Sequence, residues 1–222
     1  MQQFIAIIIG LGLLLLLWRQ WRAAEQKLLA QPQHLFSEVL DLLDEPEIVQ
    51  GEAIGTWIVS GRYKGQFFQL KAIIDTLATR KLPSLWLMLT LPRPQKLEAT
   101  LDLVMRPTAL TSFSNFDFLP HTLETPADFP AHAVIRTDDP ERCPAVDIFR
   151  EHLTLFETRA GKELLISPQG LRIVVQVAEV DRLRYGVFRE ANFGDTVIDR
   201  ELTSQCLETL LALQESLKLK NV

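Results

Sequence analysis

The sequence is poor in the features that mark many enzymes and secreted proteins. It has two cysteines and four histidines in 222 residues, which excludes a framework held together by several disulfides. It contains no GxGxxG, GxxxxGK[ST], GxSxG or HExxH pattern. Nothing therefore indicates a nucleotide-binding loop, a serine nucleophile or a catalytic zinc helix of these kinds. Enzymatic activity stays uncertain on this basis, and we expect no cofactor.

Basic residues are also scarce relative to acidic ones. The chain has 23 Lys and Arg against 28 Asp and Glu, a net charge of −5. Binding to DNA or RNA relies on lysine and arginine contacts with phosphates, so an acidic chain is a poor candidate for it. We expect no nucleic-acid partner.

One long apolar run is present at the N-terminus. No charged residue occurs from Phe4 to Trp18, and with its uncharged flanks the run can supply the ~20 residues that cross a bilayer. No basic residue precedes it and no small-residue cleavage site follows it, which disfavours a signal peptide; a buried core helix is the other alternative. We predict a single-pass transmembrane signal anchor. Its membrane-spanning positions include Phe4, Ile9, Leu14 and Trp18, and its membrane-interface positions are Trp18, Arg19, Trp21 and Arg22.

The charges around this run predict its orientation. Arg19, Arg22 and Lys27 follow the run closely, and no basic side chain precedes it. Positive flanks remain on the cytoplasmic side of a membrane. The predicted location is therefore the cell (inner) membrane, with the N-terminus outside, the folded domain in the cytoplasm and the lipid bilayer as one partner.

Residues 1–30 are predicted to form the anchor and a juxtamembrane helix. Residues 31–222 are predicted to form a soluble domain with possible subdomains at 31–110 and 131–222. In the first of these, the apolar pattern predicts a helix over residues 34–45, a β-hairpin that turns near Lys64 and Gly65, and strands over residues 84–92 and 96–106. We expect these four strands to form an antiparallel meander.

The second half repeats this mixture of elements. We predict a strand over residues 132–137, a helix from Asp139 that is interrupted near Cys143, a hairpin that turns through residues 168–170, and a strand over 182–188. A long C-terminal helix is predicted from about residue 197 to 218, with one apolar stripe formed by Leu202, Cys206, Leu210, Leu213 and Leu217. The predicted fold class is α+β: an N-terminal transmembrane helix, then an antiparallel β-sheet domain with packed helices, including this C-terminal one.

The irregular stretch over residues 107–130 is the place where a binding site is most expected, because connections of this length are often functional. Its phenylalanines either pin a crossover onto the sheet or form a ligand or partner site; the candidates are Phe113, Phe116 and Phe118. Polar residues in and after this stretch give a weak metal candidate, and they are His121, Glu124, Asp128 and His132. Pro126 and Pro130 prevent a helix there, and the spacing matches no usual zinc pattern, so we expect solvated loop residues and no metal site.

The order of features resembles a diffuse group of uncharacterised bacterial membrane-anchored proteins. The resemblance is carried by the apolar N-terminal run, by the hairpin segment GRYKGQFFQL (residues 61–70) and by VIRTDDPE (residues 134–141). It implies a single-pass anchor in front of an α+β domain. It implies no activity.

Three functions are compatible with these patterns. The first is a membrane-tethered binding or scaffolding module for a protein partner, which predicts an exposed apolar or aromatic patch. The second is a carrier or sensor of an apolar small molecule, which predicts a cavity lined by Cys206, Leu210 and Leu213. The third is an enzyme whose histidines and acidic residues converge over residues 121–132.

Overall fold

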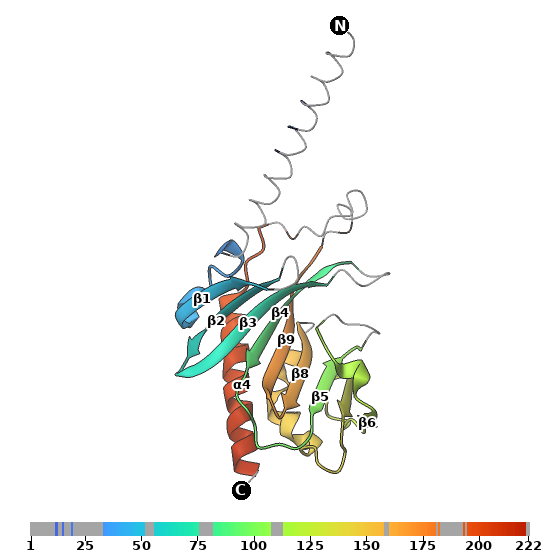
Figure 1. Cartoon of the computed structure of the whole chain (residues 1–222). Coiled ribbons are helices and arrows are strands. Elements are labelled where there is room, and N and C mark those ends of the chain that lie inside the picture. Colours follow the sequence, from blue (N-terminus) through green and yellow to red (C-terminus); the bar gives the residue numbers. More distant parts are fainter. Residues whose placement is uncertain are drawn as a thin grey trace.

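The computed structural model describes residues 33–51, 56–75, 82–107, 113–157, 160–180 and 195–220, and the single positions 12, 15, 19, 182 and 193. Its strands are β1 (Asp44–Gln50), β2 (Trp57–Tyr63), β3 (Gln66–Asp75), β4 (Ser84–Leu91), β5 (Leu101–Met105), β6 (His121–Leu123), β7 (Ala133–Thr137), β8 (Gly161–Ser167) and β9 (Gly170–Glu179). They form one nine-stranded sheet in the order β1-β2-β3-β4-β9-β8-β5-β7-β6. Every neighbouring pair is antiparallel. The sheet is strongly twisted, so β1–β3 run across the direction of β8 and β5 (Figure 1).

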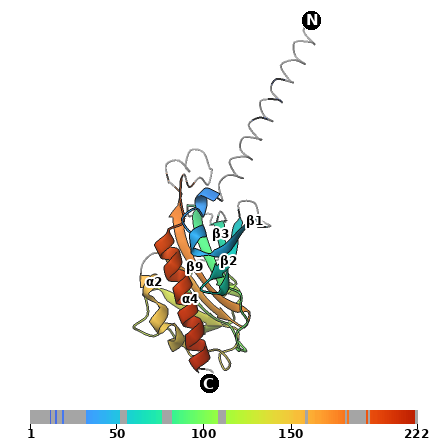
Figure 2. The ribbon, with the colours of Figure 1, turned by 90° about the vertical axis from the view of Figure 1, so that its left-hand side faces the viewer.

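One long helix, α4 (Arg200–Lys220), lies along one face of this sheet (Figure 2). It begins where the backbone N–H of Leu202 donates to Asp199 Oδ1 at 2.6 Å, which is an N-cap bond. α4 packs on β4, on β9 and on the 3-10 helix η3 (Val146–His152). Short helical segments include η1 (Leu40–Leu42), η2 (Phe116–Phe118) and α2 (Thr154–Glu157).

The main core lies between α4 and the sheet face that α4 covers. Alternate residues of β4 from Leu85 to Leu91 are buried in it, because successive side chains of a strand point to opposite faces. The helix contributes most of its predicted apolar stripe, and the buried members are Cys206, Leu210, Leu213 and Leu217.

The opposite side of the sheet, called the second face below, mixes polar and apolar rows. Strand register aligns one row across β4, β9, β8, β5 and β7, and its members are Thr90, Arg172, Leu165, Asp102 and Arg136. A small apolar cluster covers part of this face and contains Ile73, Phe113 and Val174, with Trp86 and Met88 packed against it.

Both predicted hairpin turns are present. Lys64 and Gly65, between β2 and β3, have φ of 49° and 76°, the left-handed values that a two-residue hairpin turn uses. The β8–β9 turn ends at Gly170, where φ is 156° and a Cβ would lie 2.3 Å from the carbonyl oxygen of Leu91. Only glycine fits there, so this turn lies directly against the end of β4.

The predicted fold class is contradicted. The described residues are mostly β with one long C-terminal helix, and none of their helices is long and apolar enough to cross a membrane. The same finding contradicts the predicted single-pass membrane location. The uncharged run from Phe4 to Trp18 has 15 residues, fewer than the ~20 of a helical span, and the prediction depended on adding its flanks. Of the predicted membrane positions the structure describes Arg19; the others lie outside the described residues and are Phe4, Ile9, Leu14, Trp18, Trp21 and Arg22.

The predicted four-stranded meander is also wrong. β4 has β9 as its second neighbour, and β5 pairs with β7 and β8. Residues 92–100 connect β4 to β5, and a connection of this length does not force adjacent pairing as a two- to five-residue hairpin loop does. Alternation identified both strands, but it carries no information about their partners.

The predicted helix over residues 34–45 is wrong over most of its length. The chain turns after Leu35, forms η1, becomes extended at Leu43 and continues as β1. Val39 and Leu43 are nevertheless buried in the main core. They stand at either end of η1, and the turn between them brings both side chains to the same side, as a turn of α-helix would. The strand predicted over residues 182–188 lies outside the described residues, apart from position 182.

Candidate functional site: a cleft on the second face

A cleft of about 410 Å³ opens on the second face of the sheet. It lies between the end of β4, the β8–β9 turn, the start of β5 and the segment around η2. Its volume is in the range of small-ligand sites, roughly 300–1,000 Å³. The residues that line it are Thr90, Pro92, Thr100, Asp102, Asn115, Leu119, Leu165, Ser167, Gln169, Gly170, Leu171 and Arg172.

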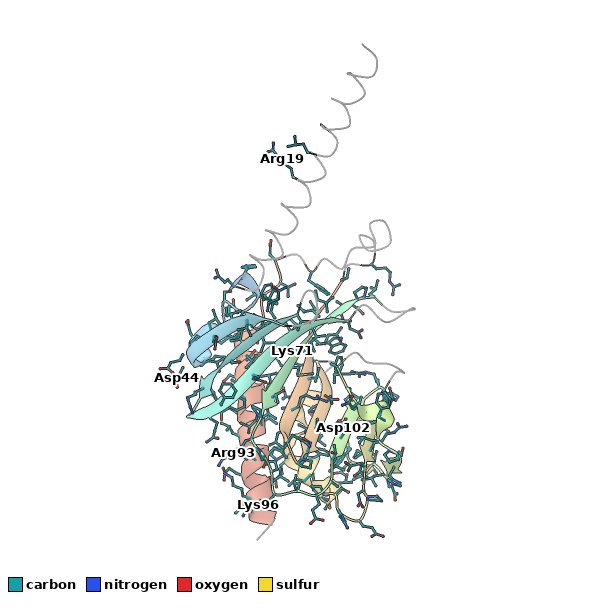
Figure 3. The ribbon with its side chains drawn as sticks, in the orientation of Figure 1. Arg19, Asp44, Lys71, Arg93, Lys96 and Asp102 are labelled. Atoms are coloured by element: carbon teal, nitrogen blue, oxygen red, sulfur yellow. The ribbon has the colours of Figure 1, made fainter. Side chains whose placement is uncertain are left out.

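Asp102 is the buried carboxyl of this cleft. It lies on β5 opposite Leu165 of β8 and Arg136 of β7, in the right-hand half of the sheet in Figure 3. It is 1% exposed, and its Oδ1 has no hydrogen-bond partner. Burial raises the pKa of this carboxyl well above its ordinary value, the charge of Glu163 raises it further, and Arg172 lowers it. Asp102 therefore keeps its proton to a higher pH than a solvated aspartate does.

An ion pair between β8 and β9 forms the neighbouring part of the site. Arg172 Nε donates to Glu163 Oε2 at 2.8 Å, and Arg172 Nη2 donates to Glu163 Oε1 at 3.1 Å. Glu163 is fully buried, and the Arg172 side chain is 17% exposed. A two-pronged bond of this kind holds the guanidinium plane fixed. The pair brings no net charge to the cleft, since each partner neutralises the other.

The rim of the cleft is held by hydrogen bonds from neighbouring loops. The backbone N–H of Thr100 donates to Asp138 Oδ1 at 2.7 Å, and Ser167 Oγ donates to the carbonyl of Gly170 at 3.0 Å. The backbone N–H of Gln95 donates to the Pro168 carbonyl at 2.9 Å. The Gln95 bond joins the β4–β5 connection to the β8–β9 turn, the Thr100 bond joins that connection to the segment after β7, and the Ser167 bond closes the turn itself. The walls on that side are therefore preformed.

Arg136 fixes the wall that contains η2. Its Nη1 donates to the carbonyls of Phe116 and Asp117, each at 3.4 Å, and its guanidinium lies 5.0 Å from the centre of the Phe116 ring. Asn115 and Leu119, on either side of η2, line the cleft. The segment is therefore anchored to the sheet at the edge of the site.

The three phenylalanines proposed as a partner site divide into two groups. Phe113 and Phe116 are buried, and Phe113 packs against Trp86 with ring centroids 5.3 Å apart. Phe118 is 79% exposed. Two of the three thus behave as the crossover alternative expects, and the third is exposed and directly precedes Leu119, which lines the cleft.

The weak metal candidates do not come together. All four side chains are exposed, Asp128 forms an ion pair with Arg150, and no group of three or more His, Cys, Asp or Glu in the described part of the chain could hold a metal ion. The candidates are His121, Glu124, Asp128 and His132.

The cleft residues themselves were missed by the sequence patterns. Asp102 falls on the polar side of the alternation in β5, and such positions ordinarily face solvent. One signal was present: Val104 is apolar on that same side, and it is buried in the structure. An apolar residue on the polar side of a strand indicates that the second face is partly covered.

The chemistry of the site favours binding. None of the described residues that line it is a histidine, cysteine or lysine, and its one arginine is paired with Glu163. It offers hydroxyl and amide groups, apolar walls and one carboxyl oxygen without a partner. In native proteins a buried polar atom of this kind needs an explanation, and a bond to a ligand is one.

We expect Asp102→Asn to stabilise the protein at neutral pH. The folded-state pKa of Asp102 is raised, so the folded protein binds this proton more tightly than the unfolded chain. Stability is then lost as pH rises from the unfolded pKa to the folded one, by at most about 1.4 kcal/mol per pH unit. An asparagine at position 102 does not ionise, so the variant does not lose stability in this way as pH rises. Urea unfolding between pH 3 and 8 should show a gain that grows with pH and disappears near the acid end.

The control for this experiment is Asp41→Asn, because Asp41 is exposed and its replacement should change stability by less than about 0.5 kcal/mol at every pH. An Asp102→Asn variant that is less stable than the parent at pH 7 would show that the carboxylate is ionised and well paired, contrary to the burial argument.

No protein-family model, no curated protein and no solved structure matches the chain.

Proposed function

We propose that this protein is a binding module that docks a protein partner on the second face of the sheet, with Phe118 at the rim of the cleft as the anchoring side chain. The observation that carries the proposal is the 79% exposure of Phe118, which directly precedes Leu119, a residue that lines the preformed cleft. Aromatic side chains next to concave, partly polar surfaces are frequent energetic centres of protein interfaces. An aromatic side chain that stays in water forgoes the free energy it would gain if a partner buried it.

The local structure makes Phe118 a rigid anchor. It belongs to η2, and its backbone N–H donates to the Asn115 carbonyl at 2.9 Å. Arg136 bonds to the carbonyls of the two preceding residues. Because the segment is already fixed, a partner that covers Phe118 pays little ordering entropy.

Exposed apolar side chains also gather on the second face. Among the described residues the large exposed hydrophobic ones are Leu15, Val49, Phe67, Phe118 and Leu219. Register with Lys71 and Met88 puts Val49 on the second face, and alternation along β3 puts Phe67 there as well. Val49 and Phe67 therefore lie on the second face, on strands at the other side of the sheet from β7.

The two other functions have less support. Cys206, Leu210 and Leu213 are completely buried in the main core, and the cleft lies on the other face of the sheet. Burial also raises the pKa of the Cys206 thiol to about 12, so it has no nucleophilic form at neutral pH. The histidines and acidic residues over residues 121–132 are exposed and do not form a common site.

Photo-crosslinking tests the proposal. A benzophenone amino acid at position 118 should yield one discrete adduct in cells, because a docked partner contacts that position. Leu219 is the matched control, since it has the same 79% exposure and lies at the end of α4. The same label at position 219 should yield no such adduct.

A second variant ties the adduct to binding energy. Phe118→Ser should leave the free energy of unfolding within about 0.5 kcal/mol of the parent, because the ring is solvated, and should prevent copurification of the adduct partner. Leu219→Ser should change neither property. Equal adducts at positions 118 and 219, or loss of folding in Phe118→Ser, would contradict the proposal.

A further inference from the structure

We infer that the cleft receives a cationic side chain of the partner, a lysine ammonium or an arginine guanidinium, in contact with Asp102. The inference deepens the proposed function and rests on it for the source of that side chain. The chemistry it assigns to the cleft can be tested without the partner.

The first step is the distribution of charge around Asp102. Glu163 on β8 and Arg172 on β9 neutralise each other. Arg136 on β7 is the register neighbour of Asp102; its Nη1 bonds to backbone carbonyls of η2, and its Nε is buried without a partner. Lys162 on β8 donates to the carbonyls of Met105 and Arg106 at 2.7 Å and 2.9 Å. Among the described residues, Arg172 is the cation whose charge acts on Asp102, and it is already bonded to Glu163.

The second step is the carboxyl itself. Asp102 is one of the residues that line the cleft, and it is 1% exposed. Its Oδ1 is buried and has no hydrogen-bond partner. A ligand cation placed there would give this oxygen a charge-assisted hydrogen bond, which is roughly twice as strong as a neutral one. It would also make the ionised form of Asp102 favourable in a site that now disfavours it.

The third step is the shape and polarity of the walls. Leu119, Leu165 and Pro92 supply apolar surface along the cleft, which suits the aliphatic stem of a lysine or arginine. Further acceptors for the remaining donors of the cation are present in the hydroxyl and amide groups of Thr90, Thr100, Asn115 and Gln169. The lining combines an apolar passage with a carboxyl group.

An anion fits this site poorly. The fork of Arg172 already binds Glu163 through two nitrogen atoms, and an anion would lie beside two carboxyl groups. The whole chain carries a net charge of −5, which favours the approach of cations over anions. A neutral amide can bond to a protonated carboxyl, but its binding would weaken when the carboxyl ionises, whereas cation binding would strengthen.

The experiment uses the full chain and four small probes with unbranched alkyl stems of three or four carbons: n-butylammonium, n-butylguanidinium, butyramide and butyrate. Binding is followed by backbone amide NMR shifts, and the ionisation of Asp102 by the ¹³C shift of its carboxyl carbon. We expect both cations to shift the amide signals of Thr100, Asn115 and Gln169 and to lower the pKa of Asp102. Their affinity should rise with pH, by at most about tenfold per unit, because binding releases a proton.

Two variants separate the site from general attraction to an acidic protein. Asp102→Asn should weaken both cations at least tenfold and abolish the pH dependence, and Asp41→Asn, at an exposed position, should change neither. If Asp102→Asn fails to fold, Gln169→Leu at the mouth of the cleft serves instead and should weaken the cations at least threefold. The ratio of the ammonium to the guanidinium affinity tells which basic side chain the cleft prefers.

Several outcomes would overturn the inference. Butyramide binding as tightly as the cations would make the cleft a neutral amide site, and tighter binding of butyrate would make it an anion site at Arg172. Cation shifts spread over the surface, or no shift near Asp102 at about 100 mM probe, would exclude a cation site. Failure of the crosslinking at position 118 together with cation binding here would remove the protein partner and leave the cation chemistry standing. Crosslinking at position 118 without cation binding would support a protein partner and exclude the cation chemistry of the cleft.

Discussion

Leu210→Ala lowers the free energy of unfolding by about 2–5 kcal/mol. Leu210 is completely buried at the centre of the α4 stripe and belongs to the main core. The loss is the sum of two free-energy terms: the burial of the deleted atoms, which is forgone, and the cost of the cavity that remains. The cavity remains because the rigid sheet below can collapse only in part. A domain has roughly 5–15 kcal/mol in total, so this one side chain carries a large share.

The charged variant Leu210→Asp should not fold, because the core has no partner for a carboxylate. Ala212 provides the matched control: it is exposed on the same helix, and Ala212→Asp should cost less than about 1 kcal/mol, because aspartate is a poorer helix former than alanine. Urea titrations followed by circular dichroism measure all three variants. A Leu210→Asp protein with an unchanged midpoint would place the stripe at the surface and refute the packing described above.

Glu163→Gln should lower the free energy of unfolding by about 3–5 kcal/mol, because it leaves the Arg172 charge in a partly buried place without its carboxylate. The geometry supports a value at this scale: Glu163 is fully buried and accepts two bonds from the guanidinium. The double variant Glu163→Gln with Arg172→Met should recover most of the loss, since apolar residues often replace buried ion pairs without cost.

An exposed pair gives the contrast for this prediction. Glu215 and Lys218 lie on the outer side of α4 with both side chains largely solvated, and Glu215→Gln should cost less than about 1 kcal/mol. Thermal or urea unfolding compares the two substitutions directly. A loss at Glu163 as small as that at Glu215, or no recovery in the double variant, would show that the buried pair does not organise the second face.

The elements that could be predicted from the sequence are those whose cause is local. The hairpin at Lys64 and Gly65 was predicted because two residues set its turn, and the helix that ends the described chain was predicted because one stripe repeats with the helical period. The turn at Gly170 was predicted because Pro168, Gln169 and Gly170 separate two apolar segments. In each case the physical determinant lies within a few residues of the element.

The elements that could not be predicted depend on distant parts of the chain. The apolar alternation of β4 is the same whether its neighbour is β5 or β9, so the order of strands was lost. Asp102 is distant in sequence from Glu163 and Arg172, which face each other across the predicted β8–β9 hairpin. Each alone is an ordinary polar residue on an alternating strand. The cleft forms because β5 pairs with β8, and no pattern within a short segment predicts that pairing.

The position of β9 between β4 and β8 has a consequence for the newly made chain. Leu91 of β4 pairs with Leu171 of β9, 80 residues later. At ~5–20 residues per second, the ribosome takes about 4–16 s to supply that partner. During this interval β1–β4 can pair among themselves, but β4 stays an unpaired edge that is apolar on both sides. Such an edge can pair with strands of other chains. The N-terminal half is therefore prone to aggregation until β9 has been synthesised and covers the edge of β4.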